Sequence, residues 1–355
     1  MREAGGWKRT AGRAALGASV GVLLLGGGFL SGTPTGRYLA RAGWEEGRIL
    51  LARQPIEALV ADSAVPEPTR AKLRLVLEAR AFAEDSLGLP AGGSFTTFTD
   101  LGRDTLVLVL SGAARDTLAP VTWWFPIVGR VPYKGFFDVD QARAAERALR
   151  ARGFDTYLRP SPAFSTLGWF DDPLLSTTLA ADSVDLVNTV IHELTHNRYY
   201  APDGAVFNES FANFVGARGA ERFFLARGDT VRAVRAAARW ADERRLAAFW
   251  RALAGAIDSA FAAHPGTAGQ PARLAARDTL YARARRRLVD SVAPTFATID
   301  PRYARVVALD NAALLARRVY LSDLEAFEAT FAAAGRDLRG AIARLIETHR
   351  AGVTR

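Results

Sequence analysis

The most regular hydrophobic pattern of the chain lies between residues 184 and 194, where apolar positions recur every three or four residues. This spacing places them on one face of an amphipathic helix. Asp182 or Ser183 can cap the start of the helix, because a short polar side chain there accepts a hydrogen bond from a free backbone N–H. The pattern therefore predicts a buried helix, and its apolar face carries Val187, Val190, Ile191 and Leu194.

Strand-like patterns precede this helix. The strand candidates are residues 94–99, 105–110, 121–125, 156–158 and 164–167. Residues 105–110 are nearly all apolar, so we expect them to form a central strand, and we expect 121–125 to extend the same sheet. Residues 137–152 return to helical spacing and predict a helix between the strands.

Helical patterns occupy both ends of the chain. Residues 37–90 predict a helical lead-in, and beyond Asp229 a long Ala- and Arg-rich helix is followed by several others. We therefore predict an α+β protein with a small mixed sheet. Its predicted parts are a membrane helix at 1–36, the lead-in at 37–90, an α+β domain at 91–227 and a mostly helical domain at 228–355.

The amino terminus has the pattern of a secretion signal or signal anchor. Basic residues occur up to Arg13, and the stretch 14–36 then carries no charge. No Ala-x-Ala cleavage site stands out, and the uncharged stretch is long enough to span a bilayer. We expect a membrane-anchored protein outside the cytoplasm, on the periplasmic side of a bacterial inner membrane; the alternative is secretion after cleavage.

Composition narrows the classes of protein that remain. The 355 residues are 49% hydrophobic and include no cysteine, which excludes disulfides and thiolate metal sites. The formal charge of +9 comes mainly from Arg scattered among acidic residues. The run 283–287 favours a solvated helix face or anionic lipid headgroups over nucleic acid, because no aromatic residues interleave with it.

The helix of the first pattern carries the motif His192-Glu193-Leu194-Thr195-His196. Histidines four residues apart lie on the same face of a helix and can bind one metal ion, with Glu193 beside them. The chain has only 4 histidines, and two of them fall in this motif. The motif therefore indicates the HExxH arrangement of zinc hydrolases.

A catalytic zinc needs a third protein ligand and an open position for water. Residues 201–204 predict a tight turn, and a second helix after it carries Glu209, which can complete a site of two His and one Glu. Asp203 is the rival ligand, although Pro-Asp-Gly is first a turn sequence. A metzincin would need Gly and His where Tyr199 and Pro202 stand, so that class is excluded.

These residues resemble the gluzincin metallopeptidases, whose second metal-binding helix carries an Asn-Glu-x-x-Ala signature like residues 208–212. More closely, the chain resembles the bacterial family of predicted zinc aminopeptidases. The segments that carry this resemblance are Arg37–Ile56, Pro126–Gly135, Ser165–Pro173, Val206–Ala212 and Asp310–Tyr320. The resemblance implies a gluzincin-like sheet with the metal helix packed beneath it, a Zn2+ cofactor and a helical domain that closes the cleft.

Metal chemistry suggests a role for each residue. Zinc activates a bound water, and Glu193 is the expected general base that passes its proton to the leaving amine. The resemblance suggests Tyr320 as the donor to the oxyanion, with Tyr199 and Tyr200 as fallbacks, although a tyrosine there is more often a packing residue. Asn213 and Asn208 are expected to orient the metal ligands; the alternative for Asn213 is a solvent-facing helix residue.

By analogy with gluzincins, one of the strands before the metal helix can pair with an extended peptide substrate. Ser165, Thr166 and Leu167 are the expected substrate-binding residues; the alternative is that this strand is only a sheet edge. We expect peptide hydrolysis by an aminopeptidase. An endopeptidase remains open, because the chain lacks the Gly-x-Met-Glu-Asn segment of well-known gluzincin aminopeptidases, and a non-catalytic membrane scaffold is the third possibility.

Overall fold

The computed structural model describes residues 32–125, 129–161, 172–202, 204–320 and 322–353. Contacts divide the chain into two compact units, Met1–Arg53 and Gln54–Arg355. The first unit contains α2 (Pro34–Leu51), and the hydroxyl of Thr33 caps its start by accepting a hydrogen bond from the Gly36 N–H at 2.9 Å. The second unit holds both sheet and helices, so the protein is of the mixed α+β class.

The predicted membrane helix lies mostly outside the described residues. Within the described ranges, no helix is both long and apolar enough to cross a membrane. Helix α2 illustrates why, because Arg41, Glu45 and Arg48 interrupt it with charge. The membrane helix therefore stays a prediction.

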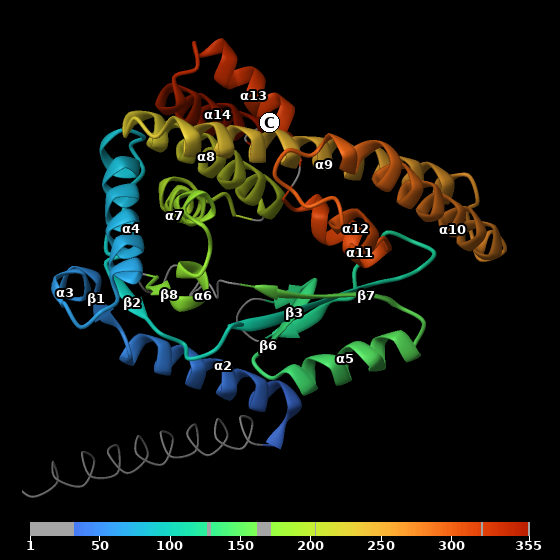
Figure 1. Cartoon of the computed structure of the whole chain (residues 1–355). Helices are drawn as coiled ribbons and strands as arrows, with labels where there is room; N and C mark the ends of the chain where they lie inside the picture. The colour runs from blue at the N-terminus through green and yellow to red at the C-terminus, as the bar shows by residue number, and fades with distance from the viewer. Residues whose placement is uncertain (1–31, 126–128, 162–171, 203, 321, 354–355) are drawn as a thin grey trace, which may run out of the picture. The chain divides into compact units, whose positions relative to one another are not determined.

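A small antiparallel sheet forms one side of the second unit (Figure 1). Its strand order is β6-β3-β7, and the strands are β3 (Val107–Ala113), β6 (Tyr133–Phe136) and β7 (Asp155–Ser161). The central position predicted for the apolar strand is confirmed. Helix α5 (Val139–Ala151), also predicted, covers one face with Ala142 and Leu149 against Leu110.

The remaining strands do not join this sheet. One group consists of β1 (Gln54–Pro55), β2 (Thr97–Thr99) and β8 (Leu174–Leu175), and the other of β4 (Trp123–Phe125) and β5 (Gly129–Val131). The prediction that 121–125 extends the central sheet is wrong, because β4 pairs with β5 instead. The predicted strand 164–167 lies outside the described residues.

The main hydrophobic core surrounds α7 (Ser183–Arg198) and α8 (Ala205–Ala226). Around them pack α4 (Glu67–Asp85), α9 (Thr230–Ala262), α13 (Leu324–Ala333) and α14 (Leu338–Val353). Most of α8 is buried on every side, as expected for a helix whose apolar residues are not confined to one stripe. Residues from the predicted lead-in, α+β and helical parts therefore share a single core.

A second cluster forms where α9 turns back into α10 (Gln270–Arg287). The π-helix Leu288–Val292 and the 3-10 helix Ala293–Thr295 follow, then α11 (Tyr303–Val306) and α12 (Asn311–Arg318). The carboxylate of Asp242 is fully buried and accepts hydrogen bonds from the backbone N–H groups of Ala297 and Thr298 at 2.9 and 2.7 Å, which fixes this connection on α9. Two short helices, α3 (Ile56–Ala61) and α6 (Ser176–Leu179), complete the fold.

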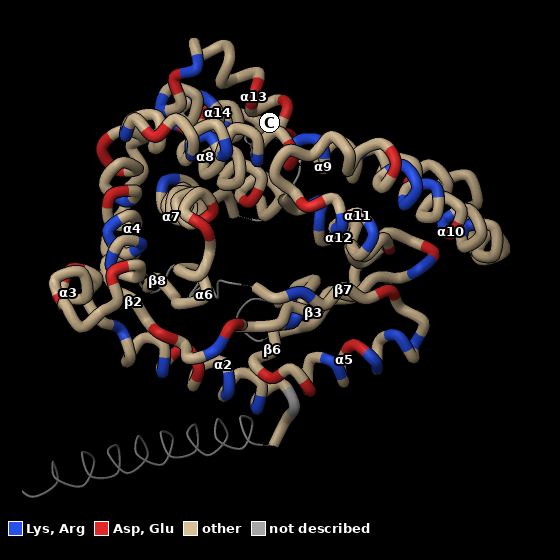
Figure 2. Tube along the Cα trace, in the orientation of Figure 1, with Lys and Arg blue, Asp and Glu red and all other residues tan. Residues whose placement is uncertain are grey.

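The charges are distributed as the composition suggests. Figure 2 shows basic and acidic residues interspersed along α4 and α5. Within the run 283–287, Arg283, Arg286 and Arg287 are exposed at the end of α10. Arg285 instead turns inward and donates to the carbonyl oxygens of Ala304, at 2.6 Å, and Val307. Arg285 therefore stabilises the fold, unlike the exposed arginines of the run.

Two glycines allow α8 to approach α7 closely. A Cβ added at Gly216 would lie 2.4 Å from the Asn188 side-chain oxygen and 2.9 Å from the Asn188 carbonyl oxygen. One added at Gly219 would lie 2.8 Å from Ile191. Real Cβ atoms do not tolerate such separations, so any larger residue must push the helices apart.

We predict that Gly216→Ala destabilises the protein by about 1–3 kcal/mol, because the added methyl group overpacks the α7–α8 contact. Thermal unfolding measured by circular dichroism tests this. Gly255→Ala on α9 is the matched control: nothing lies within 4 Å of its Cβ position, so the change should stabilise by about 0.4–1 kcal/mol. Equal stability of the two variants would contradict the proposed close contact.

Candidate metal site

Helix α7 begins and ends where the sequence predicts. The Asp182 carboxylate accepts hydrogen bonds from the N–H groups of Val184 and Asp185 at 2.9 and 3.1 Å. The four apolar residues of the predicted face are fully buried, namely Val187, Val190, Ile191 and Leu194. Because that face is fixed in the core, His192 and His196 project together from a different, partly exposed side.

The connection from α7 to α8 is held by Asn208. Its side-chain oxygen accepts from the Ala201 N–H at 2.8 Å, and its amide group donates to the Ala201 carbonyl at 2.9 Å. The Gly204 N–H also bonds to the Ala201 carbonyl at 3.1 Å, which closes the predicted turn. These hydrogen bonds bring the first turn of α8, and with it Glu209, back over the end of α7.

His192, His196 and Glu209 meet at one point, as the sequence suggests. Their candidate ligand atoms all lie within 4.8 Å of one another. The Glu209 carboxylate oxygens are 3.6 Å from His192 Nε2 and 3.9 Å from His196 Nε2. In a tetrahedral zinc site with bonds of ~2.0 Å, neighbouring ligand atoms are about 3.3 Å apart, so the side chains would have to move closer together to bind the ion.

The electrostatics of the cluster favour a positive charge at its centre. Burial lowers the pKa of His192, but contacts with Glu209 and the nearby charge of Glu193 outweigh it and raise that pKa. Burial raises the pKa of Glu209, but the two histidines and Arg159 outweigh it and keep the carboxyl acidic. Burial and the charge of His192 lower the pKa of His196 to about 4. Zinc binds neutral imidazoles and ionised carboxylates, so His196 and Glu209 are in the forms that bind it, and His192 would have to lose its proton when the ion binds.

Glu193 lies beside the cluster on the same helix. Burial raises its pKa; the charge of His192 opposes this, and the nearby carboxylates of Glu209 and Asp172 reinforce it. Its side chain is partly exposed. The structure thus places a carboxylate next to the three candidate ligands. A group that accepts a proton from an attacking water has to lie in such a position.

The two asparagines proposed as orienting residues have different partners. Asn213 donates to the Tyr320 carbonyl at 2.9 Å, and its contact with the His192 ring raises the pKa of that imidazole. It therefore connects a candidate ligand to the end of α12, as a residue that orients an imidazole should. Asn208 is almost fully buried, and its side-chain amide hydrogen-bonds the backbone of Ala201. Its described contacts therefore stabilise the connection between α7 and α8.

Tyr320 lies beside the cluster, where the resemblance suggests it. Burial raises the pKa of its hydroxyl, and the charge of Glu209 contributes to the same shift, while Arg159 opposes it. The guanidinium of Arg159 lies over the Tyr320 ring at 5.8 Å from its centre. Of the fallbacks, Tyr200 lies against the His196 ring at 5.9 Å, whereas the Tyr199 hydroxyl pairs with His349 Nδ1 at 3.1 Å, next to the core aromatic Phe207.

Sequence reasoning missed Arg159 and Tyr133, which come to the site from the sheet. The pKa of Tyr133 is raised by burial and by the nearby Tyr200 and Glu209. Tyr133 falls in the segment 126–135 that carries the family resemblance, which was the available signal. For Arg159 the only signal was its position directly after the predicted strand 156–158. The predicted substrate-binding residues Ser165, Thr166 and Leu167, and the rival ligand Asp203, lie outside the described residues.

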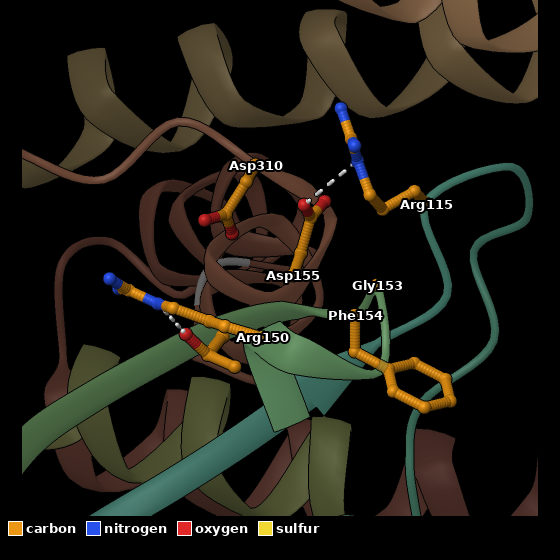
Figure 3. Close-up of a pocket in the computed structure, with 7 residues that line it drawn as sticks. Arg115, Arg150, Gly153, Phe154, Asp155 and Asp310 are labelled. Carbon is orange, nitrogen blue, oxygen red and sulfur yellow. Dashed lines mark hydrogen bonds and ion pairs between the residues drawn. The ribbon is translucent and has the colours of Figure 1, made fainter. Parts of the chain in front are cut away.

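A separate polar network fixes the start of α12, and so the position of Tyr320 at its far end. Figure 3 shows the hollow beside it, a cavity of about 230 Å³ lined by Asp155, Asp310, Arg115 and Arg150. The Asp155 carboxylate accepts the Asn311 N–H at 3.0 Å and pairs with Arg277, while Asn311 donates to the Ala114 carbonyl at 2.8 Å. Asp155 and Asn311 therefore connect the start of α12 to β7 and to the residue that follows β3.

Comparison with known proteins gives a single kind of match. A family model described as putative aminopeptidase matches residues 37–352. No curated protein and no solved structure matches the chain. The matched range includes both helices of the metal cluster, the central sheet and α12.

Proposed function

The chain belongs to the putative aminopeptidase family, and from that premise we propose that it is a zinc-dependent peptidase whose metal is held by His192, His196 and Glu209. Membership of the family supports a peptidase. The observation that carries the finer proposal is the convergence of two imidazoles and one carboxylate within 4.8 Å, with Glu193 beside them. Two His and one Glu are a ligand set of catalytic zinc sites, and they leave a coordination position open.

When bound, zinc would polarise the scissile carbonyl and lower the pKa of a water molecule. Glu193 would accept a proton from the attacking water and deliver it to the nitrogen of the leaving amine as the peptide bond breaks. Structural zinc needs no neighbouring base and is usually closed by a fourth protein ligand. The presence of Glu193 therefore favours an enzyme over a non-catalytic scaffold.

Tyr320 is the proposed donor to the oxyanion that forms during hydrolysis. Its hydroxyl is oriented by Arg159, and its backbone carbonyl is held by Asn213, which also contacts His192. A donor fixed before the reaction costs no reorganisation when charge develops, which is why such groups are effective. Asn213 then acts as a positioning residue that fixes one ligand and the donor together.

The family description favours aminopeptidase action on a peptide substrate. An endopeptidase of the same fold is the alternative, because the sequence lacks the Gly-x-Met-Glu-Asn segment and its single methionine is Met1. Nucleic acid is not a proposed partner. Reporter peptides with free and with acetylated amino termini distinguish the two peptidase modes, since only an endopeptidase tolerates the blocked terminus.

We predict that Glu193→Gln retains one zinc per chain but loses peptide hydrolysis by about 10²–10⁴-fold in kcat, because the proton acceptor is gone and the ligands remain. Elemental analysis and the reporter peptides measure the two properties on the same sample. Normal turnover by this variant would remove Glu193 from the mechanism.

We predict that Glu209→Ala binds zinc at least ~100-fold more weakly, since loss of a direct ligand exceeds the 10–100-fold effect of losing an orienting partner. Competition with a chromogenic chelator gives the affinity. Glu325→Ala is the control, because Glu325 is a half-exposed glutamate that pairs with Arg244. Unchanged affinity in Glu209→Ala would transfer the ligand role to another residue.

The proposed location is the outer side of a bacterial inner membrane, by way of the uncharged stretch at 14–36. Full-length protein should stay in the membrane pellet after carbonate washing, and the catalytic part should be cleaved by protease added to spheroplasts. Protection of the whole chain from that protease would place the site in the cytoplasm and refute this topology. Release of a shortened chain would instead indicate signal cleavage.

A further inference from the structure

The register of the central sheet directs one set of side chains toward the metal cluster. Directly paired residues of neighbouring strands point to the same face, and residues two apart along a strand do so as well. Val109 of β3 pairs with Arg159 of β7, and Ser111 pairs with Tyr133 of β6. Leu110, which alternates with these residues, faces α5. Arg159 and Tyr133 therefore project from the sheet face opposite α5.

Arg159 reaches the catalytic cluster from this face. Its guanidinium lies 5.8 Å from the centre of the Tyr320 ring, close enough for the arginine to oppose the burial that raises the pKa of the Tyr320 hydroxyl. Its charge also acts on Tyr133, where it opposes the burial that raises the pKa, and on Glu209, where it adds to the effects of the two histidines that lower the pKa. The contact with Tyr320, just beyond α12, and the charge effects on Tyr133 and Glu209 place the guanidinium near the candidate metal ligands.

Arg159 forms no direct ion pair with a carboxylate among the residues that the structure describes. The nearest charge effect is with Glu209, which lies beyond ion-pair distance and is itself a candidate metal ligand. By contrast, Arg277, which is also buried, pairs with Asp155 and Asp278. A guanidinium has five N–H donors, and contact with one tyrosine leaves most of them available. A half-buried arginine of this kind at a catalytic site is suited to bind an anion.

We propose that Arg159 binds a carboxylate of the peptide substrate and so sets a preference for substrates that carry one near the scissile bond. The inference rests on the proposed function. Arg recognises carboxylates through two parallel N–H···O bonds, which suits a planar group more than a diffuse negative charge. The carboxylate can come from the free carboxyl terminus of a short peptide or from an Asp or Glu side chain.

The test compares three peptides that differ by one group each: a short peptide with a free carboxyl terminus, its carboxyl-terminal amide, and the amide with Glu in place of Gln beside the scissile bond. The wild type should cleave one of the two acidic peptides with the lower KM. In Arg159→Gln the KM for that peptide should rise about 10–100-fold, the loss of one charge-assisted pair, while the KM for the neutral amide stays the same. Because Arg159 also contacts Tyr320, kcat should fall by the same factor for all three peptides. Whichever acid is preferred identifies the source of the carboxylate.

Two variants separate substrate binding from a structural role. Arg159→Lys keeps the charge but not the paired donors and should recover only part of the preference. Arg152→Gln removes a charge that lies over the exposed side of the fold, against Phe154, and should leave every KM unchanged. If Arg159→Gln lowers kcat equally for all three peptides and raises the KM of neither acidic peptide selectively, Arg159 only positions Tyr320 and the proposal is wrong.

A binding measurement distinguishes failure of this inference from failure of the proposed function. Calorimetry on the Glu193→Gln protein records binding of the same peptides without turnover. If the wild type hydrolyses nothing, the proposed function is wrong, yet tighter binding of an acidic peptide that disappears when Arg159→Gln is added still supports the inference. Equal binding of acidic and neutral peptides by the Glu193→Gln protein overturns it.

Discussion

The close packing of α8 against α7 is the constraint on which the metal cluster depends. Gly216 and Gly219 remove the side chains that would separate the helices, and Asn208 clips the connection between them to Ala201. Together they set where Glu209 stands relative to the two histidines. A displacement of about 1 Å between the helices would matter, because zinc accepts ligands only within a narrow range of distances.

The sheet supplies the second half of the site. Its face opposite α5 presents Arg159 and Tyr133, while α12 delivers Tyr320 from the side. The polar network of Asp155, Arg277 and Asn311 anchors α12 to the sheet, so the donor and the arginine are held by the same elements. The candidate metal ligands thus belong to the helical core, and Arg159 and Tyr133 belong to the sheet. In the proposed function, metal chemistry and substrate preference are therefore carried by different parts of the fold.

Local features of the site could be predicted from the sequence, and distant ones could not. The cap at Asp182, the buried face of α7 and the turn at Ala201 depend on residues only a few positions apart, which spacing and turn chemistry reveal. The strand at β3 was recognisable because residues 105–110 are nearly all apolar. By contrast, the apolar run at β4 predicts a strand but not the strand that it pairs with. The prediction that 121–125 joins the central sheet was wrong for that reason. Arg159 reaches Tyr320 only through strand register, a long-range property that a local pattern does not encode.

The central claim is that two imidazoles and one carboxylate of this chain bind a single zinc ion. X-ray absorption at the zinc edge of protein loaded with one equivalent of zinc tests it most directly. The account predicts four or five N and O neighbours at about 2.0–2.2 Å, with the outer-shell scattering of two imidazole rings, and loss of one O neighbour in Glu209→Ala. A spectrum with one imidazole or none, or identical spectra for the two proteins, would contradict it.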